Sequence, residues 1–239
     1  MTRHFGVLIP STNTTVEIEY NRLLPDTLQA HIGRLGRDGE SPFSSSLNED
    51  IEYQSRMLGT AKVEVVSLAQ TSASLFEANY DEVTKRRMSD AAGVPAITSA
   101  EAVGEAVRAL GARRVALVSP YSETVIALAK NYYESKYGLS VLAMEAFAAQ
   151  DAYEIGALGP EHATAAFKGI DNAEIEVLLV PGGNFPTMKF IDGWEAQLGK
   201  PVITTNQAAL WAILDVLQVR TPLPGLGQLL ARMPPRSAR

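Results

Sequence analysis

An internal repeat is the feature that most restricts how this 239-residue chain can fold. Three segments of the first half recur in the second half in the same order: 6–16 matches 115–125, 63–72 matches 175–184, and 93–110 matches 199–214. One match could arise by chance between strand and helix units, whereas three in the same order indicate a duplication. Residues 1–110 and 113–217 are therefore predicted to form two halves of related structure.

Short apolar runs alternate with helical patterns along both halves. Most runs are continuous, which is typical of parallel strands covered on both faces. The segment SAEAVGEAVRALG predicts a helix with Ser99 as N-cap and Gly111 at its end, and a later helix is expected to begin with Asn206 as its cap. This order predicts the α/β class, with parallel sheets flanked by helices. The predicted strands are 4–10, 29–35, 63–69, 95–99, 113–119, 139–145, 176–181 and 201–205.

The composition argues against two classes of partner. A net charge of −6 and a pI of about 5.2 do not provide the basic face that nucleic acid needs. No apolar run reaches the ~18 residues of a membrane helix, and FGVLIP near the N-terminus is too short for a signal peptide. The sequence therefore predicts a cytoplasmic protein with no nucleic-acid or membrane partner.

The residues available for chemistry are also restricted. The chain contains no cysteine, which excludes disulfides, thiolate metal sites and cysteine nucleophiles. Its three histidines, His4, His31 and His162, lack the spacing of metal ligands. The glycine-rich phosphate-binding patterns and the G-x-S-x-G hydrolase pattern are absent. Neither a metal nor a cofactor is expected.

Four turns after predicted strands are rich in hydroxyl, amide and glycine residues: PSTNTT (10–15), AQTSAS (69–74), SPYSET (119–124) and PGGNFPT (181–187). Single turns of this kind are common as helix caps. Four turns related by a repeat are expected to meet in one cleft, because parallel sheets bind ligands at the carboxyl ends of their strands. Helix N-termini gathered there favour an anion.

The donors in these turns are uncharged, which suits a small mono- or dicarboxylate better than a nucleotide. Gly182 and Gly183 let the backbone approach a ligand closely. The side-chain donors are Asn13, Thr71, Ser72 and Tyr121.

Charged residues near the turns leave alternatives open. The segment 33–46 is either a lid or a flexible connection, and Arg34 or Arg37 within it could clamp a second carboxylate. Further along, Lys189, Asp192 and Glu195 either reach the cleft or form a solvated helix face.

These motifs resemble the aspartate/glutamate racemase superfamily, specifically its maleate cis-trans isomerase and arylmalonate decarboxylase branch. GVLIPSTNTTVE is similar to the opening of maleate isomerases and puts Asn13 where the family has an Asn that contacts a substrate carboxylate. AQTSAS resembles the A-C-T-S segment of the family, and VPGGN resembles the C-G-G segment of the decarboxylases. SPY puts Tyr121 where the family has a substrate-binding Tyr, and the resemblance extends over roughly 5–217.

The resemblance implies two pseudo-symmetric, flavodoxin-like lobes with the active site in the cleft between them. The first lobe is expected to comprise 1–95 and 206–239, and the second 96–205. Trp211 is expected in the core, and GLGQLLARM near the C-terminus is expected to form a short helix that packs on the first lobe or on a partner.

The family uses cysteines at two positions, and this chain has neither. Gln70 stands at the first position and Pro181 at the second. Thiol-dependent racemisation, isomerisation and protonation are therefore excluded, while the carboxylate-binding residues are retained.

The sequence thus predicts an enzyme that acts on a small mono- or dicarboxylic acid without cysteine. An isomerase, decarboxylase or lyase in which neutral donors stabilise an enediolate fits these residues. A Gln-assisted hydrolase and a non-catalytic carboxylate-binding protein remain as alternatives, and a homodimer is possible. The predicted catalytic residues are Gln70 and Tyr121, and the predicted substrate-binding residues are Asn13, Thr71, Ser72, Pro181, Gly182 and Gly183.

Overall fold

The computed structural model describes residues 2–37, 46–149 and 151–236. It contains two four-stranded parallel sheets, in the orders β2-β1-β3-β4 and β6-β5-β7-β8. The two orders are the same when the halves are aligned, which confirms the predicted duplication. The first sheet contains β1 (Arg3–Pro10), β2 (Leu28–Leu35), β3 (Val66–Leu68) and β4 (Ala96–Thr98), and the second contains β5 (Arg114–Ser119), β6 (Ser140–Ala146), β7 (Val177–Val180) and β8 (Val202–Thr204).

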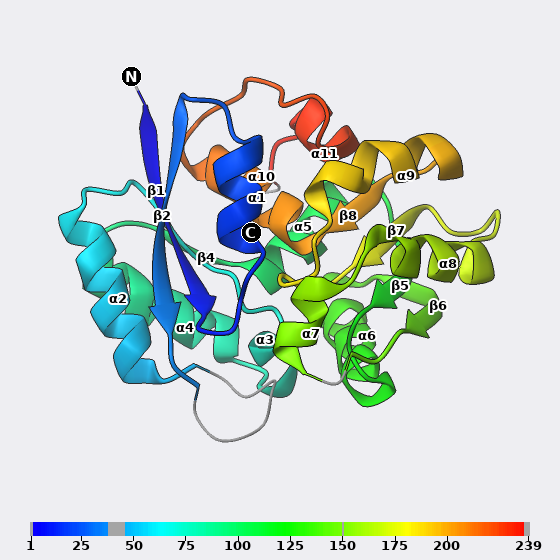
Figure 1. The fold of residues 1–239 in the computed structure, drawn as a ribbon, viewed down its shortest axis with the longest axis horizontal. Helices are drawn as coiled ribbons and strands as arrows, with labels where there is room; N and C mark the ends of the chain where they lie inside the picture. The colour runs from blue at the N-terminus through cyan, green and yellow to red at the C-terminus, as the bar shows by residue number, and fades with distance from the viewer. Residues whose placement is uncertain (1, 38–45, 150, 237–239) are drawn as a thin grey trace.

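All eight predicted strands are confirmed, although β3 is shorter than expected because its pairing is limited to three residues. Helices connect the strands and cover the sheets (Figure 1). The helices of the first half are α1 (Val16–Leu23), α2 (Asn48–Thr60), α3 (Ala73–Phe76), α4 (Tyr80–Ala92) and α5 (Ser99–Ala109). Those that follow are α6 (Glu123–Tyr137), α7 (Ala152–Ala157), α8 (Pro160–Ile170), the 3-10 helix η1 (Met188–Phe190), α9 (Ile191–Leu198), α10 (Thr205–Val216) and α11 (Gly227–Arg232).

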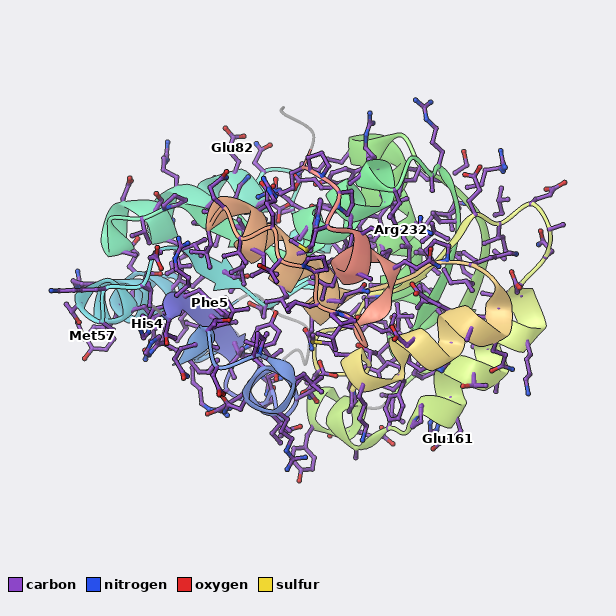
Figure 2. All side chains as sticks on the ribbon, turned by 90° about the horizontal axis from the view of Figure 1, so that it is seen from above. His4, Phe5, Met57, Glu82, Glu161 and Arg232 are labelled. Carbon is purple, nitrogen blue, oxygen red and sulfur yellow. The ribbon has the colours of Figure 1, made fainter. Side chains whose placement is uncertain are left out.

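One hydrophobic core extends across both halves. Figure 1 shows α5 and α10 between the two sheets, and these two helices pack against each other. Seen from above in Figure 2, α10 lies between the elements that carry Met57 at one end of the molecule and Glu161 at the other. Phe5 from β1 and the fully buried Trp211 from α10 belong to this core, as predicted for Trp211. Burial on both faces explains why the strands read as continuous apolar runs.

The outer face of the first sheet has a separate, smaller core. Leu8 and Leu35 of the strands pack there against Ile51 and Leu58 of α2 and Met88 of α4. Gly59 allows α2 and α4 to approach closely, since a Cβ at this position would lie 2.5 Å from the Ala92 carbonyl oxygen.

Two predicted helix caps are corrected. The helix expected to begin at Asn206 is capped at Thr204, whose N–H donates to Gln207 Oε1 at 3.3 Å. Asn206 is therefore inside α10, and its side chain contacts α1 instead. The N-cap of α5 is Thr98, one residue before the predicted Ser99.

The structure adjusts the predicted lobes at two edges. The boundary after residue 95 falls just before β4, which pairs with β3, so residues 96–98 belong to the first sheet. Helix α11, predicted within the first lobe, packs against α9, α10 and β8. Its Leu229 and Leu230 are fully buried, so it completes the core on the side of the second sheet. The remaining division into lobes stays a prediction.

The predicted lid segment is partly outside the described residues. Gly33 to Leu35 belong to β2, Arg37 and Ser46 form an isolated antiparallel bridge, and residues 38–45 are not described. Among the described helices, none is long and apolar enough to cross a membrane.

A buried carboxylate joins the two halves beside α3. Asp81 of α4 is fully buried and accepts hydrogen bonds from Ser74 Oγ and Thr98 Oγ1, both at 2.7 Å. It also accepts from Tyr132 Oη at 2.6 Å and Lys136 Nζ at 2.7 Å, which belong to α6 in the second half. The fold tolerates this buried charge because four donors, one of them the Lys136 cation, form hydrogen bonds with the carboxylate.

The change Asp81→Asn is expected to lower the free energy of unfolding at neutral pH by about 2–3 kcal/mol, because Lys136 and Tyr132 lose a charged partner. Burial raises the pKa of Asp81, but hydrogen bonds led by that from Lys136 outweigh it and hold the pKa below its usual value. The contribution is therefore present above the unfolded-state pKa of about 3.9 and lost as pH falls through the lower folded-state pKa. Urea unfolding at neutral and acidic pH measures both effects.

Arg220→Gln is the matched control, because Arg220 forms an exposed ion pair with Asp215 at 2.6 Å. Exposed pairs contribute about 0–1 kcal/mol, so this variant should unfold nearly as the wild type does. A loss from Asp81→Asn no larger than that of the control would contradict the prediction.

Candidate active site

The four predicted turns meet at one cavity between the two halves. The turns follow β1, β3, β5 and β7, and each supplies at least one lining residue. The cavity volume is about 50 Å³, which suits a ligand of a few heavy atoms better than a nucleotide. The lining residues are Pro10, Thr12, Asn13, Arg37, Ala69, Gln70, Thr71, Ser72, Tyr121, Ala152, Ile155, Gly182, Gly183 and Asn184.

Asn13 is oriented by the start of α1. Its Oδ1 accepts hydrogen bonds from the N–H groups of Thr15 and Val16, both at 3.0 Å. These two donors determine which way the amide group faces. Nδ2 has no hydrogen-bond partner within the described residues, so it is available to a ligand in the cavity that Asn13 lines.

Thr71 lies in a cluster of hydroxyl groups where the two halves meet. Its Oγ1 is 3.1 Å from Ser99 Oγ and 3.4 Å from Thr205 Oγ1, at the N-termini of α5 and α10. It also forms a hydrogen bond with Tyr121. Ser72, the next residue, is buried beside the cavity, and no hydrogen bond of its hydroxyl occurs within the described part of the chain. Ser72 is therefore the freer of these two predicted donors.

Tyr121 is suited to donate a proton and not to accept one. It is 4% exposed, and burial raises its pKa well above the usual value, which the hydrogen bond with Thr71 opposes. A phenol with a raised pKa stays protonated at neutral pH. Of the roles predicted for Tyr121, the structure favours that of hydrogen-bond donor or acid.

The two glycines after β7 differ in what they offer a ligand. The Gly182 N–H donates to Thr205 Oγ1 at 3.0 Å and is thus engaged within the protein. The Gly183 N–H has no such partner in the described ranges, and Gly183 lines the cavity. Gly182 has φ of +137°, a conformation that side chains disfavour, which explains a glycine at this position.

Gln70 contacts the segment that begins α2. Its Oε1 accepts from Ser46 Oγ at 2.7 Å and from the Ser46 N–H at 3.3 Å. The oxygen that would orient a water molecule is therefore already bonded within the protein. Gln70 lines the cavity, and its side chain also anchors Ser46.

Pro181 is placed differently from the prediction. It is buried, it is outside the cavity lining, and its carbonyl accepts from Ser119 Oγ at 3.0 Å. Pro181 therefore joins the turn after β7 to Ser119 at the end of β5 and does not line the cavity.

The structure separates the two candidate arginines. Arg37 lines the cavity and has no carboxylate partner among the described residues. Arg34 pairs instead with Glu17 at 2.9 Å and donates to the Asn13 carbonyl at 3.0 Å. Both arginines lie in segment 33–46, and only the tertiary structure shows that Arg37 is the one that lines the cavity.

Some residues around the site were missed or misplaced by sequence reasoning. Asn184 lines the cavity and joins the halves, since its Oδ1 accepts from the Thr14 N–H at 2.8 Å. Its place in the repeated segment 175–184 was the available signal. Asp192 and Glu195, by contrast, accept from the N–H groups of Gly227 and Gln228 and hold α11. Pro10, Thr12 and Ala69 also line the cavity and belong to the predicted turns, whereas Ala152 and Ile155 of α7 lie outside them.

The donor set fits a small anion. The described lining contains no carboxylate, imidazole or thiol, and no metal-binding group of three or more His, Cys, Asp or Glu occurs in the residues that the structure describes. The described lining contains one cation, Arg37, together with several neutral donors.

Comparison with known proteins assigns the family. The family model for arylmalonate decarboxylase matches residues 5–230. The chain belongs to the arylmalonate decarboxylase family. This confirms the branch that the sequence motifs predicted, and the solved structures of relatives confirm the two-lobed α/β fold. The similar proteins include isomerases as well as decarboxylases.

Three relatives of the arylmalonate decarboxylase family show the extent of the similarity. The arylmalonate decarboxylase of Bordetella bronchiseptica is 29% identical over 215 residues, with 86% of this chain and 87% of that protein covered. The structure of a maleate isomerase variant from Pseudomonas putida S16 with maleate is 27% identical, with a TM-score of 0.89 and coverage of 97% and 98%. A Nocardia farcinica maleate cis-trans isomerase variant with a covalently bound succinylcysteine intermediate is 25% identical, with a TM-score of 0.86 and coverage of 97% and 99%.

The site predicts the effect of Asn13→Asp. The aspartate keeps an oxygen for the Thr15 and Val16 N–H groups, so the start of α1 is preserved or strengthened. It replaces the Nδ2 donor by a second, negatively charged oxygen. Binding of a carboxylate is expected to weaken by about 100-fold or more, while the melting temperature without ligand stays the same or rises.

Isothermal titration with malonate and thermal unfolding measure these two properties. Thr164→Ala provides a control, since the Thr164 hydroxyl accepts from Trp194 and is outside the cavity lining. Equal malonate affinity in Asn13→Asp and the wild type would show that Nδ2 does not contact the ligand.

Proposed function

We propose that this chain is a cysteine-independent decarboxylase of a small dicarboxylic acid, with the cavity between the halves as its active site. The observation that carries the proposal is the lining itself. It combines neutral donors, an apolar wall and one cation, Arg37, that has no carboxylate partner among the described residues; the described lining holds no group that would accept a proton at neutral pH.

The neutral donors suit an enediolate. Asn13 Nδ2, the Ser72 hydroxyl, the Tyr121 phenol and the Gly183 N–H come from four turns and line one small space. Donors fixed before the reaction stabilise negative charge that develops on a carboxylate. Arg37 supplies a full positive charge for the second negative charge that an enediolate carries.

The reaction follows from this arrangement. One carboxylate of the substrate leaves as CO₂ when its bond to the α-carbon breaks, and the electron pair of that bond delocalises onto the retained carboxylate as an enediolate. The apolar side of the lining, formed by Ala69, Ala152 and Ile155, favours loss of the leaving carboxylate because a neutral gas replaces a poorly hydrated charge. A proton from the Tyr121 phenol or from water then completes the product at the α-carbon.

Other reactions of the expected set need groups that the described lining lacks. Racemisation and base-initiated isomerisation begin by removing a proton, and Arg37 and the phenol of Tyr121 are poor bases. The Nocardia relative carries a succinylcysteine intermediate, whereas this chain has no cysteine. A Gln-assisted hydrolysis would need the Gln70 oxygen that Ser46 occupies. Decarboxylation begins without a base and is favoured for that reason.

The same absence of a base favours one second candidate. A chain that kept the donors and lost catalysis would bind small carboxylates without turnover. A decarboxylase and a non-catalytic binding protein would share this sequence and fold, so a measurement of turnover is needed to distinguish them. A homodimer and a cytoplasmic location stay predictions.

The experiment uses malonates with hydrogen, alkyl and aryl substituents on the α-carbon. Thermal shift and titration report binding, and released CO₂ together with the monoacid product reports turnover. Binding with CO₂ release supports the proposal. Binding without release supports the binding protein, and the absence of any binding would contradict both.

Tyr121→Phe tests the predicted donor and acid. Removing one donor of an enediolate site is expected to lower kcat by about 100- to 1,000-fold, with a smaller change in KM. Tyr153→Phe is the control, because Tyr153 is 67% exposed and outside the lining. Wild-type kcat in Tyr121→Phe would show that the phenol takes no part in the reaction.

A further inference from the structure

A second buried carboxylate, that of Glu19, joins the two halves and is linked to the cavity lining through Asn206. Glu19 lies on α1 in the first half and is 7% exposed. Within the part of the chain that the structure describes, every hydrogen bond that its carboxylate accepts comes from the second half. Oε1 accepts from the N–H groups of Thr187 and Met188 at 2.7 and 2.8 Å, and Oε2 accepts from Asn206 Nδ2 at 2.7 Å.

Asn206 links Glu19 to Gly183 in the cavity lining. The same Nδ2 that donates to Glu19 also donates to the Gly183 carbonyl at 3.0 Å. The Asn206 carbonyl accepts from the Tyr20 hydroxyl at 3.0 Å, so α1 holds Asn206 at two points. A Cβ at residue 183 would lie 3.2 Å from Asn206 Oδ1, so the glycine permits this close contact.

The hydrogen bonds that Glu19 accepts therefore hold both ends of the turn after β7. Gly183 and Asn184 line the cavity at the start of this turn, and Thr187 and Met188 end it. One carboxylate thus holds the end of the turn directly and its start through Asn206. Desolvation of the Glu19 carboxylate is costly, and burial therefore raises its pKa above the usual value. The hydrogen bonds that it accepts, led by that from Asn206, oppose this rise.

We infer that Glu19 is a positioning residue of the active site, which acts through Asn206 to fix the Gly183–Asn184 wall against the donors of the first half. Glu19 is outside the cavity lining and has no role in bond breaking. The inference rests on the proposed function, because a fixed wall matters for activity only if the cavity binds the substrate.

Glu19→Gln breaks one contact selectively. The new amide oxygen still accepts from Thr187 and Met188, whereas the new NH₂ group faces Asn206 Nδ2, so two donors meet where one donated before. The expected result is a looser turn in a folded protein.

Glu195→Gln is a matched control from the same chain. Glu195 is also 7% exposed, its pKa is also raised by burial, and its carboxylate also accepts from backbone N–H groups. Those groups belong to Val202 and Gln228, so it ties α9 to β8 and α11 and not to the turn. A general cost of losing a buried carboxylate would appear equally in both variants.

Hydrogen exchange of peptides covering 181–190 tests the inference without any ligand. Exchange there is expected to rise about tenfold in Glu19→Gln, as for the loss of one hydrogen bond, and to stay within about twofold in Glu195→Gln. Equal exchange in Glu19→Gln and wild type, or an equal rise in both variants, would overturn the inference. If Glu19→Gln fails to fold, Asn206→Ala removes the same link and is read in the same way.

Malonate affinity tests whether the position of the turn matters to the site. The dissociation constant is expected to rise about tenfold in Glu19→Gln and in Asn206→Ala, with no further rise in the double variant, because both changes break one link. Additive effects, or faster exchange with unchanged affinity, would overturn the inference. If the wild type binds no malonate or substituted malonate, the proposed function fails, and the exchange result still decides whether Glu19 holds the turn.

Discussion

Two buried carboxylates at the contact between the two halves have little access to water and accept hydrogen bonds from the opposite half. Asp81 on one side of the contact accepts from Tyr132 and Lys136, and Glu19 on the other accepts from Thr187, Met188 and Asn206. A sliding movement of one sheet past the other would break the hydrogen bonds that these carboxylates accept from the second half, at a cost of several kcal/mol each. The halves are thereby held in one arrangement, on which the shape of the cavity depends.

The chemistry of the cavity follows from that arrangement. The first half supplies Asn13, Ser72 and Arg37, and the second supplies Tyr121 and Gly183. Neither set alone surrounds a carboxylate. Relatives in the arylmalonate decarboxylase family include a protein with a covalent succinylcysteine, and this chain retains the surrounding fold without any thiol. The proposed reaction starts with loss of CO₂ and needs no thiol base, which is consistent with that difference.

Several features of the fold and site could be read from the sequence, because they depend on local pattern. The strands appeared as continuous apolar runs, and the order of the repeat predicted two sheets of the same topology. Asn13 and Ser72 followed strands in the repeated turns and do line the cavity. Gln70 and Pro181 were harder to interpret, since a family position indicates where a residue lies along the chain but not which contacts its side chain makes.

The sequence by itself determined the fold class, the duplication, the turns that meet and the absence of thiol chemistry, since each follows from periodicity, order or composition. The tertiary structure alone decided that Arg37 and not Arg34 reaches the cavity, that Asn206 contacts Glu19 instead of capping a helix, and that the Gln70 oxygen binds Ser46. These outcomes depend on contacts between residues far apart in the chain, and a linear pattern holds no information on which distant donor meets which acceptor.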